Sequence, residues 1–159
     1  MKRYRLEREQ WLPHSLAHVF DFFSRAENLG AITPPWVHFR FHTPLPIVMA
    51  VDRRIDYTLR LAGVPLRWRT RVTEWNPPHG FVDVQEKGPY ALWDHQHLFE
   101  EKGGGVLMCD RVDYALPLGP LGRAVHALAV RSALAAIFDY RFQHVPGLLA
   151  AQGPERSSS

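Results

Sequence analysis

The chain has 159 residues, of which 46% are hydrophobic and 12% aromatic, and its formal net charge is +3. This length is typical of a single domain, and the composition excludes a disordered chain. No apolar run approaches the ~20 residues that span a bilayer, and the charged N-terminal residues do not form a secretory signal. We therefore expect a soluble, cytoplasmic protein, in which the single cysteine, Cys109, is a buried and unreactive thiol.

The first part of the chain predicts one strand followed by short helices. Residues 4–11 alternate along a strand, which Pro13 ends. A helix is expected to begin at His14 or Ser15, and a second helical turn is expected over residues 24–29. Two short helices thus follow the first strand.

A rigid loop and a short strand come next. Residues 31–36 include Pro34 and Pro35, which fix φ and remove backbone donors. Trp36, at the end of this loop, either forms the lid or rim of a pocket or caps the edge of the core. Residues 37–43 predict a short strand.

The middle of the chain predicts a meander of antiparallel strands. Residues 53–61 and 66–75 alternate apolar and polar side chains around a turn that contains Gly63 and Pro65, which is typical of a hairpin. The strands expected after this hairpin cover residues 81–86, 90–101 and 106–116.

Residues 117–122, which contain two prolines and two glycines, are expected to end the sheet. A long helix is expected to follow them and to extend to about Val145. Arg131 falls near the middle of its apolar side and must either pair with Asp83 or Asp110 or reach solvent at the rim. Beyond a domain of residues 1–149, residues 150–159 are expected to be a disordered tail. The predicted apolar side comprises Ala124, Ala127, Leu128, Leu134, Ala135, Phe138, Phe142 and Val145.

These elements predict an α+β fold. A sheet of six to seven strands with one apolar face needs a cover, and the last helix is the only element long enough to provide it. Arg67, Arg69 and Arg71 share the opposite face. That face is either solvated and balanced by Asp56 and Glu74, or binds an anionic partner such as a phospholipid. No nucleic-acid motif accompanies it.

Three neighbouring strands each present apolar residues mixed with a few polar groups on one face. Because side chains alternate across a strand, we interpret these faces as the wall of a pocket for a small, mostly apolar molecule with one polar group. The faces are Phe81, Asp83 and Gln85; Trp93, His95, His97 and Phe99; and Val106, Met108, Asp110, Val112 and Tyr114.

Several strings resemble those of a known superfamily. They are residues 29–36, GPYALWDHQHLF at 88–99, CDRVDY at 109–114 before PLG at 117–119, and IFDYR at 137–141. The chain resembles the START-like, or SRPBCC, superfamily of helix-grip proteins, which includes Bet v 1-like and polyketide cyclase/dehydrase proteins, over residues 1 to about 149. The resemblance implies a curved antiparallel sheet around a long C-terminal helix, with a cavity between them. The superfamily contains carriers, sensors and enzymes.

We expect binding or transport of a small hydrophobic molecule, aromatic, polyketide-like or lipid-like. We expect no cofactor, no nucleic acid and no stable membrane insertion, although transient membrane contact is compatible with the sequence. The oligomeric state is left open. The expected ligand-binding residues are Tyr57, Trp68, Phe81, Gln85, Trp93, His95, His97, Phe99, Asp110, Tyr114, Arg131 and Phe138.

Three alternatives stay open at this stage. His95, His97 and Asp110 suit acid–base catalysis by a polyketide cyclase or dehydratase. The two histidines with Asp83 or Asp110 suit a metal site, although no third ligand is established and we expect none. An interaction module that binds through the arginine face, without a ligand, is the third.

Overall fold

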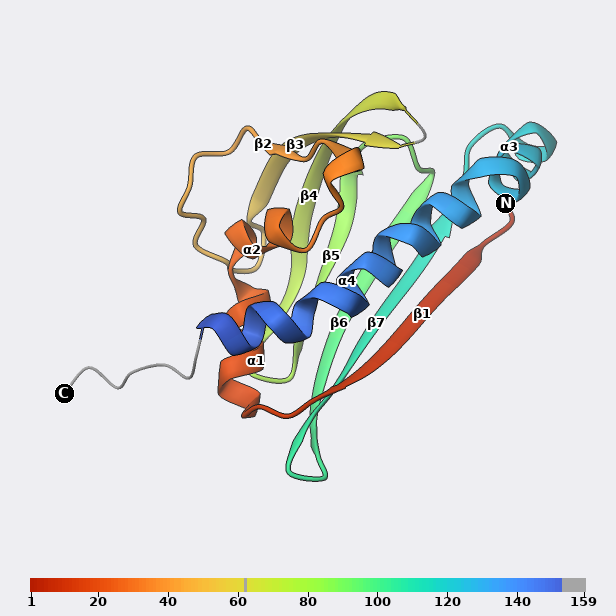
Figure 1. Cartoon of the computed structure of the whole chain (residues 1–159). Helices are drawn as coiled ribbons and strands as arrows, with labels where there is room; N and C mark the ends of the chain where they lie inside the picture. Colours follow the sequence, from red (N-terminus) through yellow and green to blue (C-terminus); the bar gives the residue numbers. More distant parts are fainter. Residues whose placement is uncertain (62, 153–159) are drawn as a thin grey trace.

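The computed structural model describes residues 1–61 and 63–152. Its strands form one antiparallel sheet in the order β1-β7-β6-β5-β4-β3-β2, so the first strand pairs with the last (Figure 1). The predicted meander is confirmed. The strands are β1 (Tyr4–Leu12), β2 (Arg40–Phe41), β3 (Arg54–Leu61), β4 (Val64–Asn76), β5 (Gly80–Lys87), β6 (Leu92–Lys102) and β7 (Gly105–Ala115).

The strand predicted over residues 37–43 is wrong in its extent, because only β2 is extended there. The Pro-rich loop starts a 3₁₀ turn, η1 (Pro35–Val37), instead. His38 then adopts a left-handed backbone with φ of 50°, which a strand cannot contain.

Two short helices follow β1, as predicted. They are α1 (Leu16–Ser24) and α2 (Ala26–Ala31). Ser15 caps α1, because its side-chain oxygen accepts a hydrogen bond from the backbone N–H of His18. The His18 ring in turn lies 3.0 Å from the carbonyl oxygen of Leu149, which attaches α1 to the end of the long helix. Together with the loop that follows, the two helices close one end of the concave face (Figure 1).

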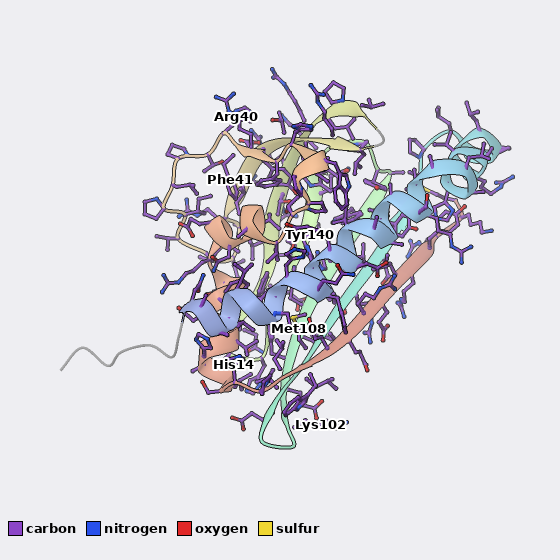
Figure 2. All side chains as sticks on the ribbon, in the orientation of Figure 1. His14, Arg40, Phe41, Lys102, Met108 and Tyr140 are labelled. Carbon is purple, nitrogen blue, oxygen red and sulfur yellow. The ribbon has the colours of Figure 1, made fainter. Side chains whose placement is uncertain are left out.

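The C-terminal part is one continuous helix that crosses this face. It comprises α3 (Gly119–Val125), a π-helical turn η2 (His126–Val130) and α4 (Arg131–Gln152). Side chains occupy much of the space between α4 and the sheet (Figure 2). By length and composition alone this helix could also cross a membrane, a property that it shares with core helices of soluble proteins.

The helix continues past its predicted end at Val145. Pro146 has no N–H for the carbonyl of Phe142, which would normally end or kink a helix. Here Gln10 of β1 donates a hydrogen bond of 2.8 Å to that carbonyl, so it stays paired. Of the predicted tail, residues 150–152 are therefore helical, and residues 153–159 lie outside the described part of the chain.

The predicted apolar side of this helix is partly wrong. Leu128 is 84% exposed and Phe142 is 48% exposed, whereas Leu134 and Phe138 are buried as predicted. A π turn contains more residues than an α turn. The buried residues of this helix are therefore spaced by four residues through η2, and not by the regular period of 3.6 residues. These buried residues are Gly122, His126, Leu134, Phe138, Val145 and Leu149.

Candidate functional site

A cavity of about 150 Å³ lies between α4, the sheet and the α1–α2 end. Its walls are mostly apolar and aromatic. From the sheet come Ile55 and Tyr57 of β3, Trp68 and Thr70 of β4, Phe81 and Asp83 of β5, and Trp93, His95 and His97 of β6. From the helices and the loop come Phe22, Phe23, Ile32, Thr33, Leu134, Phe138 and Arg141, among others.

Strand register brings the polar groups of this wall together. On β6, His95 and His97 are two residues apart and so share a face, with ring centroids 3.8 Å apart. Asp83 of β5 pairs in register with His95, and Asp110 of β7 pairs in register with His97. Each histidine therefore has a carboxylate on a neighbouring strand.

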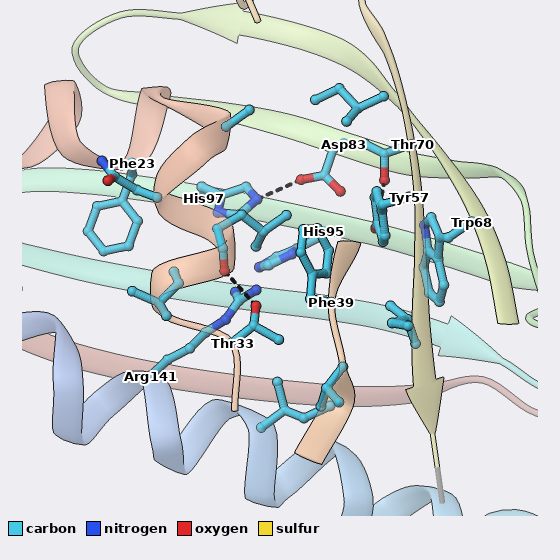
Figure 3. A pocket seen from close by; sticks show the side chains of 18 of the residues that line it. Phe23, Thr33, Phe39, Tyr57, Trp68, Thr70, Asp83, His95, His97 and Arg141 are labelled. Atoms are coloured by element: carbon cyan, nitrogen blue, oxygen red, sulfur yellow. Dashed lines mark hydrogen bonds and ion pairs between the residues drawn. The ribbon is translucent and has the colours of Figure 1, made fainter. Parts of the chain in front are cut away.

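The four side chains form one buried chain of hydrogen bonds and ion pairs, of which Figure 3 shows the bond between His97 and Asp83. His97 Nε2 lies 2.7 Å from Asp83 Oδ2, and His97 Nδ1 lies 3.4 Å from Asp110 Oδ1. The same oxygen of Asp110 lies 2.9 Å from His95 Nε2. Asp110 thus sits behind the two rings and joins them.

These contacts set different protonation states on the two histidines. Burial alone would lower the pKa of His97, but its bonds to Asp110 and Asp83 outweigh burial and raise that pKa. Both nitrogens of His97 face a carboxylate, an arrangement that favours the protonated, positively charged ring. Burial, together with the charge on His97, lowers the pKa of His95. His95 is therefore neutral.

The carboxylates are held ionised. Burial would raise the pKa of Asp110, but its hydrogen bonds from His95 and His97 hold it well below its usual value. Asp83 behaves in the same way, with its bond from His97 outweighing burial and lowering the pKa. Because His95 donates from Nε2 to ionised Asp110, its Nδ1 keeps a free lone pair, on a ring that lines the cavity.

Two neutral donors on residues that line the cavity have no protein partner. Within residues 1–61 and 63–152, Trp68 Nε1 and Tyr90 Oη are buried and make no hydrogen bond. Buried donors are rarely left unpaired, because each costs about 1–3 kcal/mol. A molecule with acceptor atoms in the cavity would satisfy them.

A metal ion fits the same residues less well. Asp83, His95 and His97 offer ligand atoms that all lie within 4.8 Å of one another. Yet His97 Nε2 and Asp83 Oδ2 are 2.7 Å apart, a hydrogen-bond distance. A zinc ion with ligands at about 2.0–2.1 Å would separate two tetrahedral ligands to roughly 3.3 Å. The geometry matches a shared proton better than a shared ion.

Most of the predicted site residues face the cavity. The residues that line it are Tyr57, Trp68, Phe81, Trp93, His95, His97 and Phe138. Phe99 belongs to the adjoining apolar core, and Asp110 lies behind the histidines. Gln85 forms two hydrogen bonds with the backbone of Tyr90, at 2.8 and 2.9 Å. It therefore fixes the segment before β6 and does not contact the cavity.

Two predicted site residues lie elsewhere. Arg131 is exposed and lines a groove beside α3, so it pairs with neither Asp83 nor Asp110 among the described residues and reaches solvent. Tyr114 lines the same groove, where its hydroxyl lies 2.7 Å from His126 Nε2. The π turn at residues 126–130 shifts the helical period before Arg131, whereas Tyr114 is placed by the register of β7 with β1 and β6.

Arg141 is one of the polar cavity residues that sequence reasoning missed, with Arg25, Asn28, Thr33 and Thr70. Arg141 lies three residues after Phe138, a spacing that puts both on one helix face, so the signal was present. Trp36, by contrast, is 57% exposed and packs edge to face on Tyr140 of α4, outside the lining. Cys109 faces away from the cavity on β7, and burial raises the pKa of its thiol.

No protein-family model matches the chain, and no curated protein matches its sequence. Solved structures do match its fold. TTHA0849 from Thermus thermophilus superposes with a TM-score of 0.76 at 14% identity, over 95% of this chain and 100% of that one. A START superfamily protein from Mycobacterium smegmatis gives 0.70 at 10% identity, over 94% and 99%.

An enzyme is also among the matches. A norcoclaurine synthase from Thalictrum, crystallised with a transition-state analogue, gives a TM-score of 0.67 at 13% identity, over 95% of this chain and 96% of that one. At these identities the likeness concerns the fold.

Proposed function

We propose that this chain, which has the helix-grip fold of the START-like (SRPBCC) superfamily, binds a small, mostly apolar molecule in the cavity between its sheet and α4. One observation carries the proposal. An aromatic-walled cavity contains the buried donors Trp68 Nε1 and Tyr90 Oη, which have no partner among the described residues. Apolar walls with a few convergent polar groups are typical of ligand sites.

The size of the cavity narrows the ligand. An engineered apolar cavity of about 150 Å³ holds benzene, and the cavity here has the same volume. Stacked and edge-to-face rings such as Trp68, Trp93 and Tyr90 surround it, and aromatic ligands make favourable contacts with such walls. A compound of one or two rings therefore fits better than a long-chain lipid.

Ligand retention tests the proposal. The freshly purified protein is measured by native mass spectrometry, and its affinity for 2-naphthalenemethanol is measured by calorimetry. Trp93→Ala should weaken binding about tenfold or more, because it removes one aromatic wall. Trp36→Ala, which removes an exposed tryptophan outside the cavity, should leave the affinity unchanged.

Loss of His95 should act in the same direction as loss of Trp93. His95→Ala removes a polar group of the cavity wall, with thermal unfolding as the check on its fold. If both cavity variants hold the ligand as tightly as wild type, the cavity is not the binding site. If 2-naphthalenemethanol does not bind and nothing co-purifies, the proposed function is wrong.

A second candidate is a cyclase or dehydratase in the same cavity, favoured by the unequal histidines. His95 is a neutral ring that Asp110 orients, as a general base requires, and His97 carries a proton, as a general acid requires. Turnover should show a bell-shaped pH dependence that disappears in His97→Ala or Asp110→Ala. A compound that binds but is not converted at any pH would exclude the enzyme function and support the carrier function.

The remaining expectations stay predictions. These are the cytoplasmic location, the single domain of residues 1–149, the lack of a cofactor or nucleic-acid partner, and the transient nature of any membrane contact.

A further inference from the structure

Arg141 is one of two arginines on the wall of this mostly apolar cavity; the other, Arg25, is exposed and pairs with Asp21. Arg141 comes from α4, and its guanidinium carbon lies 4.9 Å from the centroid of the Phe138 ring. Figure 3 shows its side chain reaching from α4 toward the interior, where Thr33 and His95 also line the cavity. A guanidinium stays charged at every physiological pH.

The protein provides no partner for this cation within the part of the chain that the structure describes. Arg141 forms no ion pair and no hydrogen bond there, and its Nε is buried. The carboxylates nearby are already engaged, because Asp83 binds His97 and Asp139 lies 3.5 Å from Arg8. Arg141 is partly buried, and none of its donors is bound by the described residues, so they are free to pair with a ligand.

The histidine network does not offer a competing cation. His97 is positive, but its two nitrogens face Asp83 and Asp110. His95 is neutral, and its remaining lone pair is an acceptor. An anionic group in the cavity would therefore meet Arg141 as its charged donor, with Trp68 Nε1 and Tyr90 Oη as neutral donors.

We propose that the ligand of this cavity is an aromatic carboxylate, whose acid group pairs with Arg141 while its ring lies among the aromatic walls. The inference rests on the proposed function and specifies its ligand. A carboxylate is planar and matches the two parallel donors of a guanidinium, so the pair can be bidentate. A volume of about 150 Å³ accommodates a ring with such a compact acid group.

Two compounds of nearly equal size test the charge directly. Calorimetry measures the affinities of 2-naphthoate, which carries a carboxylate, and of 2-naphthalenemethanol, which carries a neutral hydroxymethyl group at the same position. Wild type should prefer 2-naphthoate by about 10- to 100-fold, the range of a charge-assisted hydrogen bond. In Arg141→Met this preference should fall to about one, while the affinity for the alcohol is retained.

Arg131→Met is the matched control, because it removes an arginine from the same helix outside the cavity. It should keep the wild-type preference. Arg141→Lys keeps the charge but loses the bidentate geometry, so its preference should be intermediate. Retained binding of the alcohol in each variant shows that the cavity is still folded.

The other outcomes each overturn a different statement. If wild type binds the two compounds equally, or if Arg141→Met keeps the preference, the carboxylate inference is wrong and the proposed function stands. Arg141 then only offsets the charge of Asp83 and Asp110. If neither compound binds wild type, the carboxylate inference is wrong. If nothing co-purifies with the protein either, the proposed function fails with it.

Discussion

Each face of the sheet carries a hydrogen bond to a carboxylate, and the two bonds are of nearly equal length in opposite surroundings. On the concave face, His95 and Asp110 are 2.9 Å apart and almost fully buried. On the convex face, Arg69 and Asp56 are 2.7 Å apart and partly exposed to solvent. A distance alone does not distinguish these pairs.

Their energetic roles differ because water is present at one face and excluded from the other. In water, an ion pair is screened and contributes little. In the interior, each group has lost its hydration, so removing one partner leaves the other unsatisfied. The buried network thereby fixes which histidine holds a proton, whereas the convex pairs keep a charged face balanced. The predictions below separate the two cases.

The largest effect is expected from Asp110→Ala. This change leaves His95 and His97 without the carboxylate that joins them, which should lower the free energy of unfolding by about 3–5 kcal/mol. Urea unfolding at neutral pH measures it. Asp110→Asn keeps the size and one acceptor oxygen, so its loss should be smaller. A near-wild-type Asp110→Ala would show that the network contributes little to stability.

The sequence predicts which side chains lie on each face of the sheet, because side chains alternate along a strand with a period of two residues that tertiary context rarely alters. Trp93, His95 and His97 were assigned to one face correctly, and so were Arg69 and Arg71 to the other. The partners were harder to predict. Asp56 balances Arg69 as expected. Arg71, however, pairs with Asp52 and Glu86, and not with the expected Glu74.

The helix was less predictable than the sheet. A π turn has no clear sequence signature, and a period of 3.6 residues applied through it placed Leu128 inside and Arg131 over the sheet. Arg141, ten residues on, is the arginine of this helix that reaches the cavity. The contacts that link Asp83, His97, Asp110 and His95 could not be predicted either. Predicting them requires the register between strands, which alternation within one strand does not give.

Stability should also depend on pH in a way that the network sets. Asp83, Asp110 and His95 have lowered pKa values in the folded protein, so their contributions are lost as pH falls below the ordinary values of 3.8 and 6.5. The pKa of His97 is raised from 6.5, so its contribution is present below that pH and is lost as pH rises above it.

Urea unfolding between pH 4 and 9 measures this profile. The decline above pH 6.5 that is due to His97 should be absent in His97→Gln. The acid decline should persist, because His95 stays buried and burial is what lowers its pKa. An unchanged alkaline decline in the variant would contradict the raised pKa of His97.

The smallest effect is expected on the convex face, from Arg69→Met. Its partner Asp56 stays hydrated after the change, so no buried charge is left unpaired. The midpoint of urea unfolding should move far less than in Asp110→Ala, and the difference should vanish at 1 M salt, where screening acts over about 3 Å.

The same variant tests whether this face binds an anionic partner. Arg54 and Arg69 each lie against an acidic side chain, and Arg71 lies between two, which reduces the positive potential that an anionic membrane would meet. Cosedimentation with vesicles rich in phosphatidylserine should be weak for wild type and equally weak for Arg69→Met. Strong, salt-sensitive binding that Arg69→Met abolishes would show instead that solvent-exposed pairs can open to receive a partner, and that the convex face is a second functional surface.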